Sequence, residues 1–307
     1  MISIIGGAGF VGSNLARELQ ERQMNFRIGD LQVSQSFPEK TDILDVRDPT
    51  DLAAKLSGDI VVNLAAVHRD DIRDPREYYS TNVEGAQALC RACEEKGIEK
   101  IVFTSSVAVY GFAPPSTNEN GVINPFNEYG RTKALAEQVY REWRDKDPEN
   151  RSLIIVRPTV VFGEGNRGNV YNLLSLINSG AFVMVGNGKN KKSMAYVENL
   201  SCFLVKCIES DVKNAVFNYV DGPDLSMNDL VIFVRKKMKG DPSVGIRVPM
   251  LLGLTVGYAA DALAKIGLKL PISSIRVKKF CASSEFSTAK QKLDGFEAPF
   301  TLKQGLD

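Results

Sequence analysis

Histidine is almost absent from this chain of 307 residues, since His68 is its only one. His68 follows a predicted buried strand, and no serine or aspartate motif stands around it to make it a catalytic base. We therefore expect His68 to contact substrate or to serve as an ordinary loop residue. Net charge is also nearly absent, at +1, so the composition offers no electrostatic case for nucleic-acid binding. Basic clusters at 189–192, 276–279 and 290–292 are expected to be solvated faces unless a motif supports a phosphate site.

Cysteines are few, with five in the chain, and no leader-like segment precedes the first predicted strand at residue 2. An odd set of scattered cysteines without a leader favours a reducing cytoplasm. Cys90 and Cys93 have C-x-x-C spacing, but they lie in a helical stretch, 86–96, with no second ligand pair. They are interpreted as thiols on a helix face, and no metal site is expected. The apolar content of 44% and charged content of 24% are typical of a soluble protein with a sizeable core.

A strand, a glycine turn and a helix open the chain. Residues 2–5 are apolar or small, residues 6–12 carry glycine at every third position, and 13–22 reads as a helix. Glycine at these positions allows a sharp turn, close approach of a pyrophosphate and packing of the helix on the sheet. The helix N-terminus would then face the phosphates. The spacing predicts cofactor contacts at Gly6, Gly9, Phe10, Val11 and Gly12.

Further cofactor contacts are expected where later strands end. Asp30 closes a second predicted strand, where an acid accepts hydrogen bonds from ribose hydroxyls and repels a 2′-phosphate, so NAD is favoured over NADP. Asp45 and Val46 end a third short strand and are candidate adenine contacts. A fourth strand, 60–66, stops in small residues that leave room for a ligand at the sheet edge. The contacts expected there are Leu64, Ala65 and Ala66.

The chemistry is expected at Tyr129 and Lys133. Four residues separate them, so on a helix they lie on one face, one turn apart. An ammonium beside a phenol is expected to lower the tyrosine pKa, which would let the phenolate take a proton from a sugar hydroxyl. Ser106, at the end of a buried strand that starts at residue 100, would meet the same reacting carbon. Alone, a Tyr-x-x-x-Lys pair on a helix is usually a surface pair, and the preceding motifs give it weight.

With these motifs in this order, the chain resembles the extended short-chain dehydrogenase/reductase family, and in particular its nucleotide-sugar epimerase and dehydratase branch. The resemblance implies an α/β fold, a Rossmann-type doubly wound parallel sheet with a smaller C-terminal substrate-binding domain. It implies an NAD-binding domain over 1–162, completed by about 195–220, and a mainly substrate-binding domain over 163–307. It also implies a catalytic set of Ser106, Tyr129 and Lys133, and cofactor contacts that include Asn82, Tyr129, Lys133 and Pro158.

Longer strings resemble one group of bacterial 4-epimerases in O-antigen assembly, which act on N-acetylglucosamine carried on undecaprenyl diphosphate. These strings are 66–71, 103–111, 124–127, 157–163, 166–172, 192–197 and 274–281. Dehydratases of the branch carry Asp-Glu after the catalytic hydroxyl residue, whereas this chain has Val107-Ala108, so dehydration is disfavoured. Soluble 4-epimerases usually carry Arg where Lys192 aligns. Lys binds phosphate as a point charge.

The resemblance therefore predicts an NAD-dependent isomerase that interconverts GlcNAc and GalNAc on a diphosphate carrier, undecaprenyl diphosphate, through transient oxidation at C4. The alternatives are a soluble UDP-GlcNAc or UDP-glucose 4-epimerase, a nucleotide-sugar 4-keto reductase, and an NAD-sensing protein without catalysis. A homodimer through the helix that carries Tyr129 is expected. The expected substrate contacts are His68, Arg69, Ser105, Ser106, Asn169, Lys192 and Arg276.

Residues 248–271 are unusual for a soluble sugar-nucleotide enzyme. Nearly all are apolar or small, while Asp261, Lys265 and Lys269 recur at intervals of four. The charges and glycines argue against a spanning helix, which needs about 20 apolar residues. One interpretation is a helix in the membrane interface, which would make the enzyme peripheral at the inner face of the cell membrane. The alternative is an ordinary helix packed on the small domain or at a dimer interface.

Overall fold

The computed structural model describes residues 1–69, 72, 74–265, 267, 268, 270, 272–288, 293 and 295–307. The predicted basic cluster at 290–292 lies outside the described residues, as do Asp70 and Asp71 of the loop after His68. Three positions of the 248–271 stretch also lie outside them.

A seven-stranded parallel sheet forms the centre of the molecule, in the order β10-β6-β5-β4-β1-β2-β3. Most of its strands are short runs of β-branched and apolar residues, which suit a sheet covered on both faces. The order reverses next to β1, as in doubly wound nucleotide-binding folds, so the predicted fold class is confirmed. The strands are β1 (Ile2–Ile5), β2 (Phe26–Asp30), β3 (Thr41–Ile43), β4 (Ile60–Asn63), β5 (Lys100–Thr104), β6 (Ser152–Pro158) and β10 (Asn214–Tyr219).

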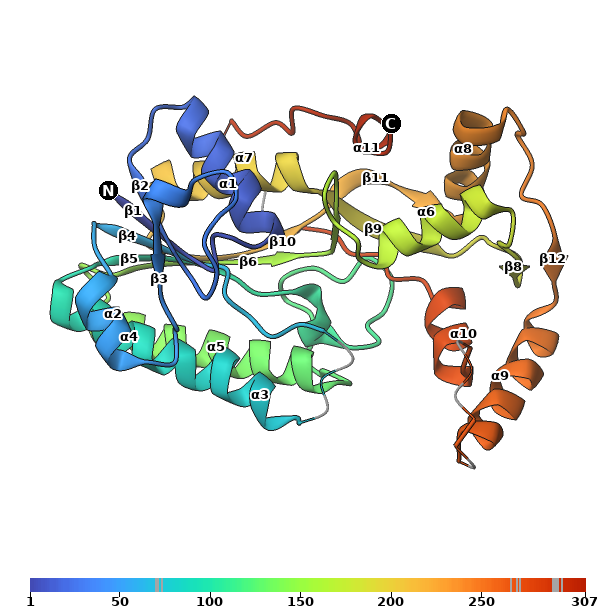
Figure 1. Cartoon of the computed structure of the whole chain (residues 1–307), viewed down its shortest axis with the longest axis horizontal. Helices are drawn as coiled ribbons and strands as arrows, with labels where there is room; N and C mark the ends of the chain where they lie inside the picture. Colours follow the sequence, from blue (N-terminus) through green and yellow to red (C-terminus); the bar gives the residue numbers. More distant parts are fainter. Residues whose placement is uncertain are drawn as a thin grey trace.

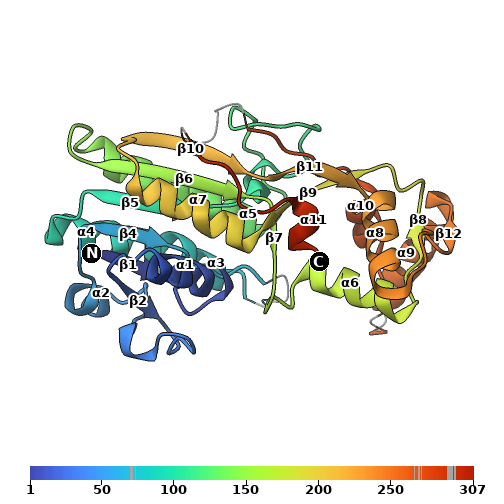
Figure 2. The ribbon, with the colours of Figure 1, turned by 90° about the horizontal axis from the view of Figure 1, so that it is seen from above.

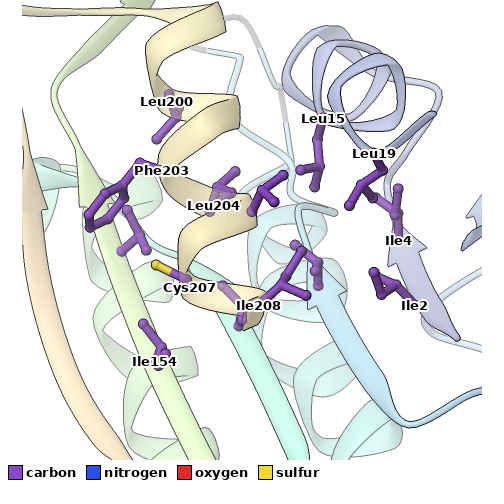
Figure 3. Packing of buried hydrophobic residues seen from close by; sticks show 14 of the residues in the cluster. Ile2, Ile4, Leu15, Leu19, Ile154, Leu200, Phe203, Leu204, Cys207 and Ile208 are labelled. Carbon is purple, nitrogen blue, oxygen red and sulfur yellow. The ribbon is translucent and has the colours of Figure 1, made fainter. Parts of the chain in front are cut away.

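Helices cover both faces of this sheet (Figures 1 and 2). On one face lie α1 (Phe10–Glu21) and α7 (Val197–Glu209), which pack against each other. Their apolar stripes, with Leu15 and Leu19 from α1 and Leu204 from α7, bury a core against the strands (Figure 3). The opposite face is covered by α2 (Pro49–Lys55), α4 (Gly85–Lys96) and α5 (Glu128–Asp145). Since α7 and β10 come from the second half of the chain, both halves of the chain build the parallel sheet and the helices that cover it.

Short helical segments connect the main elements on the way to α5. They are η1 (Pro38–Lys40), α3 (Arg76–Tyr79), the π-helical turn η2 (Ser80–Glu84) and the 3-10 turn η3 (Val107–Tyr110). Helix α5 begins where the Asn127 side chain accepts a hydrogen bond from the Gly130 N–H at 2.9 Å. This cap defines the helix start, and so places Tyr129 in the first turn.

A smaller lobe extends from the end of β6 and is built around its own apolar cluster. It contains a three-stranded sheet in the order β11-β9-β7 and a two-stranded sheet of β12 and β8. Its role in substrate binding, and the division at residue 162, stay predictions. Its elements are β7 (Val160–Phe162), α6 (Asn169–Ser179), β8 (Met184–Val185), β9 (Lys191–Tyr196), β11 (Asp221–Ser226), α8 (Met227–Lys239), β12 (Arg247–Val248), α9 (Met250–Lys265), α10 (Ser274–Cys281) and α11 (Leu302–Gly305).

Within the described residues, no helix is both long enough and apolar enough to cross a membrane. Cys90 and Cys93 are buried thiols on α4, and burial raises the pKa of both. In the described part of the chain, no group of three or more His, Cys, Asp or Glu residues is placed to hold a metal ion.

Candidate active site

A cavity of about 720 Å³ lies along the carboxyl edge of the parallel sheet. Its volume is in the range of small-molecule and cofactor sites. The cavity receives the ends of β1, β2, β4, β5 and β6, together with the first turns of α1 and α6. The predicted cofactor contacts that line it are Gly6, Gly9, Phe10, Val11, Gly12, Asp30, Asp45, Val46, Leu64, Ala65, Ala66, Tyr129, Lys133 and Pro158.

The glycine turn is crowded at two positions and open at the third. Gly6 has φ +80°, and a Cβ there would lie 2.6 Å from the backbone nitrogen of Ala65. A Cβ on Gly12 would lie 2.5 Å from the Cα of Gly7, so a side chain at either position would force the turn apart. At Gly9 a Cβ would reach only the Gly6 carbonyl, at 3.4 Å. No described side chain caps α1, which leaves backbone N–H groups for an anion. This cradle fits a dinucleotide pyrophosphate.

Asp30 stands at the end of β2, one strand away from the glycine turn. Its two carboxylate oxygens accept hydrogen bonds from the Ala8 N–H at 2.9 Å and the Gln32 N–H at 3.2 Å. These bonds hold the carboxylate at the cavity wall, where it can also accept hydrogen bonds from a ribose. The negative charge there disfavours a cofactor with a 2′-phosphate.

We expect Asp30→Asn to weaken NAD binding about tenfold or more, because a hydrogen bond to a charged acceptor is worth about 1.5–3 kcal/mol. The same change should reduce the preference for NAD over NADP. Titrations of both cofactors, followed by calorimetry, measure both effects. An Asp30→Asn protein that keeps the original affinity and preference would show that Asp30 does not contact the ribose.

The end of the cavity next to β3, where the sequence predicts adenine contacts, holds a residue that the sequence did not indicate. Asp45 lines the cavity, but the Arg47 side chain donates to both of its carboxylate oxygens, at 2.6–3.0 Å. The hydrogen bonds from Arg47 lower the Asp45 pKa. Arg47 itself lines the cavity. Asp45 and Arg47 therefore form this part of the wall together as an ion pair.

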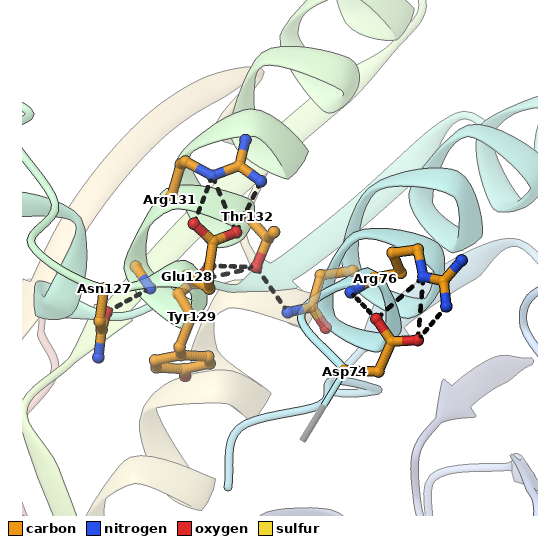
Figure 4. Close-up of polar contacts among 9 residues, drawn as sticks. Asp74, Arg76, Asn127, Glu128, Tyr129, Arg131 and Thr132 are labelled. Carbon is orange, nitrogen blue, oxygen red and sulfur yellow. Dashed lines mark hydrogen bonds and ion pairs between the residues drawn. The ribbon is translucent and has the colours of Figure 1, made fainter. Parts of the chain in front are cut away.

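Tyr129 and Ser106 meet at the other end of the cavity. The Tyr129 ring projects from the first turn of α5, away from the Arg131 side chain (Figure 4). Ser106 caps η3, where its oxygen accepts a hydrogen bond from the Ala108 N–H at 3.1 Å. Burial raises the Tyr129 pKa, and a hydrogen bond with the Ser106 side chain opposes this effect. The phenol and the hydroxyl therefore line one cavity and interact there, which a shared proton-transfer role requires.

Lys133 lines the same wall. The expectation that its ammonium lowers the Tyr129 pKa is wrong for the protein alone. The Lys133 Nζ lies over the Phe103 ring, 4.3 Å from the centroid, and the Lys133 side chain is buried. Burial lowers the Lys133 pKa to about 7, and Glu137 opposes this shift. The groups that act on the Tyr129 pKa are the surrounding protein, through burial, and Ser106. An amine with a pKa of about 7 is only partly protonated at neutral pH, so it is a weaker source of positive charge than the spacing suggested.

The depressed Lys133 pKa predicts a stability effect. In an unfolded chain the pKa of a lysine is about 10.4. Between pH 7 and that value the unfolded state binds more protons than the folded state, so the contribution of Lys133 to the free energy of unfolding rises with pH. Replacing the group removes the cost of burying a charge. We expect Lys133→Met to be inactive yet more stable at pH 7 by about 2 kcal/mol, an advantage that shrinks toward pH 10. Urea unfolding at several pH values checks this, and a constant difference would contradict it.

A buried polar network is joined to this wall of the cavity through Ser105. The Arg157 guanidinium donates to both carboxylate oxygens of Glu137, at 2.8 and 2.5 Å, and to the Tyr110 hydroxyl at 2.6 Å. Ser105 donates to the same carboxylate at 2.6 Å. The Tyr110 hydroxyl continues to Asn218 at the end of β10. Sequence reasoning missed Glu137, although its spacing of four residues from Lys133 was available as a signal.

The Asn82 amide is held by neighbouring groups of the protein, and its role as a cofactor contact stays a prediction. Its amide is buried, and it donates to the Val67 carbonyl at 3.1 Å and to the Thr132 hydroxyl at 2.9 Å, while its oxygen accepts from the Val67 N–H. Asn82 thus braces the cavity wall and does not line the cavity itself. Thr104, which does line it, has a buried hydroxyl without a hydrogen-bond partner among the described residues. That hydroxyl is available to a bound cofactor or sugar.

The predicted substrate contacts divide into two groups. His68, Ser105, Ser106 and Asn169 line the cavity. Asn169 is the first residue of α6, and no described side chain caps that helix, so a second set of free N–H groups faces the cavity. Neighbours in this wall that sequence reasoning did not single out are Thr159, Val160, Val161 and Asn166.

Arg69, Lys192 and Arg276 do not line this cavity, and their roles as substrate contacts stay predictions. The Lys192 Nζ donates to the carbonyls of Lys279 at 2.9 Å and Ala282 at 2.6 Å, at the end of α10. Burial lowers the Lys192 pKa to about 8. Arg69 and Arg276 are exposed. A diphosphate anchored by Lys192 would have to replace these carbonyl contacts.

A cavity lined by Ser106, Tyr129 and Lys133 as well as by a glycine turn is typical of nicotinamide-dependent enzymes, and the comparison with known families agrees. Residues 2–219 match the NAD dependent epimerase/dehydratase family, and the chain belongs to it. The predicted family and the predicted cofactor, NAD, are confirmed.

Individual relatives narrow the class to sugar 4-epimerases. The chain is 49% identical over its whole length to the N-acetyl-alpha-D-glucosaminyl-diphospho-ditrans,octacis-undecaprenol 4-epimerase of Escherichia coli O157:H7, of which it covers 93%. It is 28% identical to the UDP-glucose 4-epimerase of Vibrio cholerae, over 75% of this chain and 73% of the relative. The structure of MoeE5 in complex with UDP-glucose and NAD superposes with a TM-score of 0.77 at 22% identity, covering 99% of this chain and 95% of that one. The predicted enzyme class, an isomerase, is confirmed.

Proposed function

We propose that this chain interconverts GlcNAc and GalNAc on undecaprenyl diphosphate by epimerisation at C4. The full-length identity of 49% to an enzyme named for that reaction carries the choice of substrate. The contact between Tyr129 and Ser106 in the cavity supports the chemistry. The product would supply N-acetylgalactosamine for assembly of a surface polysaccharide such as O-antigen.

In this proposal, Tyr129 accepts the proton of the C4 hydroxyl while Ser106 shares the hydrogen bond. When bound in the cradle of the glycine turn and Asp30, NAD supplies reversible hydride transfer at C4. The resulting 4-keto sugar turns over. Tyr129 then returns the proton to the C4 oxygen, and C4 is left in the opposite configuration. Lys133, one helical turn along the same wall, is placed to bind the cofactor ribose. Because the hydride removed from C4 is returned to C4, and Tyr129 both takes and returns the proton, the reaction is balanced without a consumed reductant.

The neighbourhood of Ser106 argues against elimination of water. Val107 and Ala108, the next two residues, have side chains without an acid or a base. A dehydratase needs such groups to remove a proton and protonate a leaving hydroxyl. Epimerisation needs only the single acid–base pair that the wall provides.

The diphosphate is proposed to bind across the first turn of α6, where Asn169 and the free N–H groups meet the cavity. An anchor there would hold the carrier while the sugar rotates. The proposal includes a homodimer through α5. It also includes a peripheral position at the inner face of the cell membrane through 248–271, since a lipid carrier keeps the substrate at a bilayer surface.

The proposal is tested by giving the purified enzyme GlcNAc on a short, water-soluble polyprenyl diphosphate and, separately, UDP-GlcNAc and UDP-glucose. Formation of GalNAc on the polyprenyl carrier, with kcat/KM at least tenfold above that for either UDP-sugar, is expected. Faster turnover of a UDP-sugar would instead support the soluble 4-epimerase that the 28% identical relative represents. Stoichiometric consumption of added reduced nicotinamide would support a reductase and contradict the proposal.

A further inference from the structure

Helix α9 packs on the protein with its smallest residues. Gly253, Gly257 and Ala260 are its buried positions, and they recur on one face. A Cβ on Gly257 would lie 2.8 Å from the Cα of Ser274 in α10, and one on Gly253 would lie 2.5 Å from a methyl group of Val185 in β8. The close approach of α9 to its neighbours therefore depends on glycine, and large side chains cannot occupy this face.

The large apolar residues of α9 consequently point outward. Leu251 is 76% exposed and Leu252 is 53% exposed. This is the reverse of an ordinary surface helix, in which the apolar stripe faces the core. Single exposed apolar residues are common on proteins, but a continuous set marks an interaction surface. The exposed apolar residues of α9 and of the segment that follows it through α10 are Met250, Leu251, Leu252, Val256, Tyr258, Leu263, Leu268, Leu270 and Ile275.

The charged residues of this stretch are basic with one exception. The single acid between residues 248 and 281 is Asp261, and its carboxylate accepts hydrogen bonds from the Ser274 N–H at the start of α10. That acid is therefore used inside the hairpin of α9 and α10. Lys278 lies over the Tyr258 ring at 5.3 Å and Lys279 over the Phe126 ring at 4.7 Å. Within the described residues, the cations of this stretch are Lys265, Arg276, Lys278 and Lys279.

The hairpin lies at one end of the molecule. Figures 1 and 2 show α9 and α10 at the far end of the smaller lobe, away from the parallel sheet. Helix α9 has 16 residues, fewer than the ~20 apolar residues that a spanning helix needs. An outward apolar face bordered by cations matches the interface of a bilayer that carries anionic headgroups.

We propose that the outward face of α9, with the cations of α10, docks this enzyme on an anionic lipid bilayer. The inference deepens the proposed function, on which it rests, because it assigns the residues that would bring the active site to a lipid-linked substrate. Apolar side chains of α9 enter the headgroup region, while the lysines contact phosphates. The glycine face keeps α9 closely attached to α10 and β8, so the insertion holds the whole lobe at the surface.

Flotation with vesicles tests the docking. The full chain should bind vesicles of phosphatidylethanolamine and phosphatidylglycerol, and should bind phosphatidylcholine vesicles at least tenfold more weakly. Salt should reduce the binding to anionic vesicles, because lysine contacts with headgroups are screened. We expect L251S/L252S to lower binding at least tenfold, since two apolar side chains no longer leave water for the bilayer. K278Q/K279Q should lower binding about tenfold or more, since two cations near the anionic surface are lost.

The matched control is M238S/I246S, which changes two exposed apolar residues outside the hairpin and should leave binding unchanged. Wild-type protein that stays in the aqueous fraction would overturn the proposal, as would vesicle binding that L251S/L252S leaves intact. If L251S/L252S instead converts a dimer to a monomer without changing vesicle binding, the face is a contact between copies and the proposal fails.

A parallel assay separates this inference from the proposed function. L251S/L252S should keep wild-type turnover of GlcNAc on the short, water-soluble carrier, because both residues lie outside the catalytic cavity. Failure of the wild-type enzyme to turn over that substrate would refute the proposed function, whereas vesicle binding is scored independently of turnover.

Discussion

Tyr129→Phe is expected to lower kcat for C4 epimerisation by about a hundredfold to ten-thousandfold, the range for loss of a positioned general base. The phenol is the group in contact with Ser106 on the catalytic wall, and phenylalanine keeps the ring while removing the proton acceptor. NAD affinity should change less than threefold, since the ring shape is retained. Turnover of the lipid-linked substrate and a cofactor titration measure the two quantities.

Tyr79→Phe is the control for this prediction. Tyr79 is exposed on α3 and does not line the cavity, so loss of its hydroxyl should leave kcat within about twofold of the wild-type value. A Tyr129→Phe enzyme that keeps more than a tenth of its turnover would show that another group takes the proton. In that case Ser106→Ala should cause the larger loss.

Arg157→Met is expected to destabilise the fold by about 3–5 kcal/mol, because it leaves the buried Glu137 carboxylate with only Ser105 and the more distant Arg141, at 3.5 Å, as partners among the described residues. The side chains of Arg157 and Glu137 are only 4% and 5% exposed, and two hydrogen bonds join them. The free energy of unfolding from urea titration measures the effect. Activity should fall as well, since Ser105 next to Ser106 donates to the same carboxylate.

The exposed pair Arg22–Glu18 is the matched control. Its ions are 2.6 Å apart, yet Arg22 and Glu18 are 42% and 20% exposed, so Arg22→Met should cost at most about 1 kcal/mol. The double change E137M/R157M should recover more than half of the loss, since it removes both charges. If Arg157→Met costs no more than Arg22→Met, Glu137 is neutralised in the folded protein and the ion pair is not the source of stability.

The cofactor site was accessible from the sequence because its determinants are local. A strand, a glycine turn and a helix follow one another within about twenty residues, so the spacing of Gly6, Gly9 and Gly12 already specifies the cradle. The strand ends at Asp30 and Ala65 could be placed for the same reason, since parallel strands present their carboxyl ends at one edge. The pair of Tyr129 and Lys133 depends only on one turn of helix.

Effects of burial and long-range packing were not accessible in this way. The Lys133 pKa follows from the desolvation of its amine beside Phe103, which no spacing reveals. Asn82 is a residue type that often contacts a ligand. Only the structure shows that its amide donates hydrogen bonds to Val67 and Thr132. The pairing of Arg157 with Glu137 joins residues from β6 and α5 that lie twenty positions apart.

The sequence by itself determined the family and the cofactor, and it predicted that Ser106, Tyr129 and Lys133 share one site, since each is encoded in short motifs whose geometry follows from backbone periodicity. Only the tertiary structure decided which charges are buried, which polar groups are already engaged, and which way α9 faces. Sequence composition allowed α9 to be either a core helix or a surface one. The close approach of Gly253 and Gly257 to their neighbours resolves this, because the side without side chains is the only one that fits.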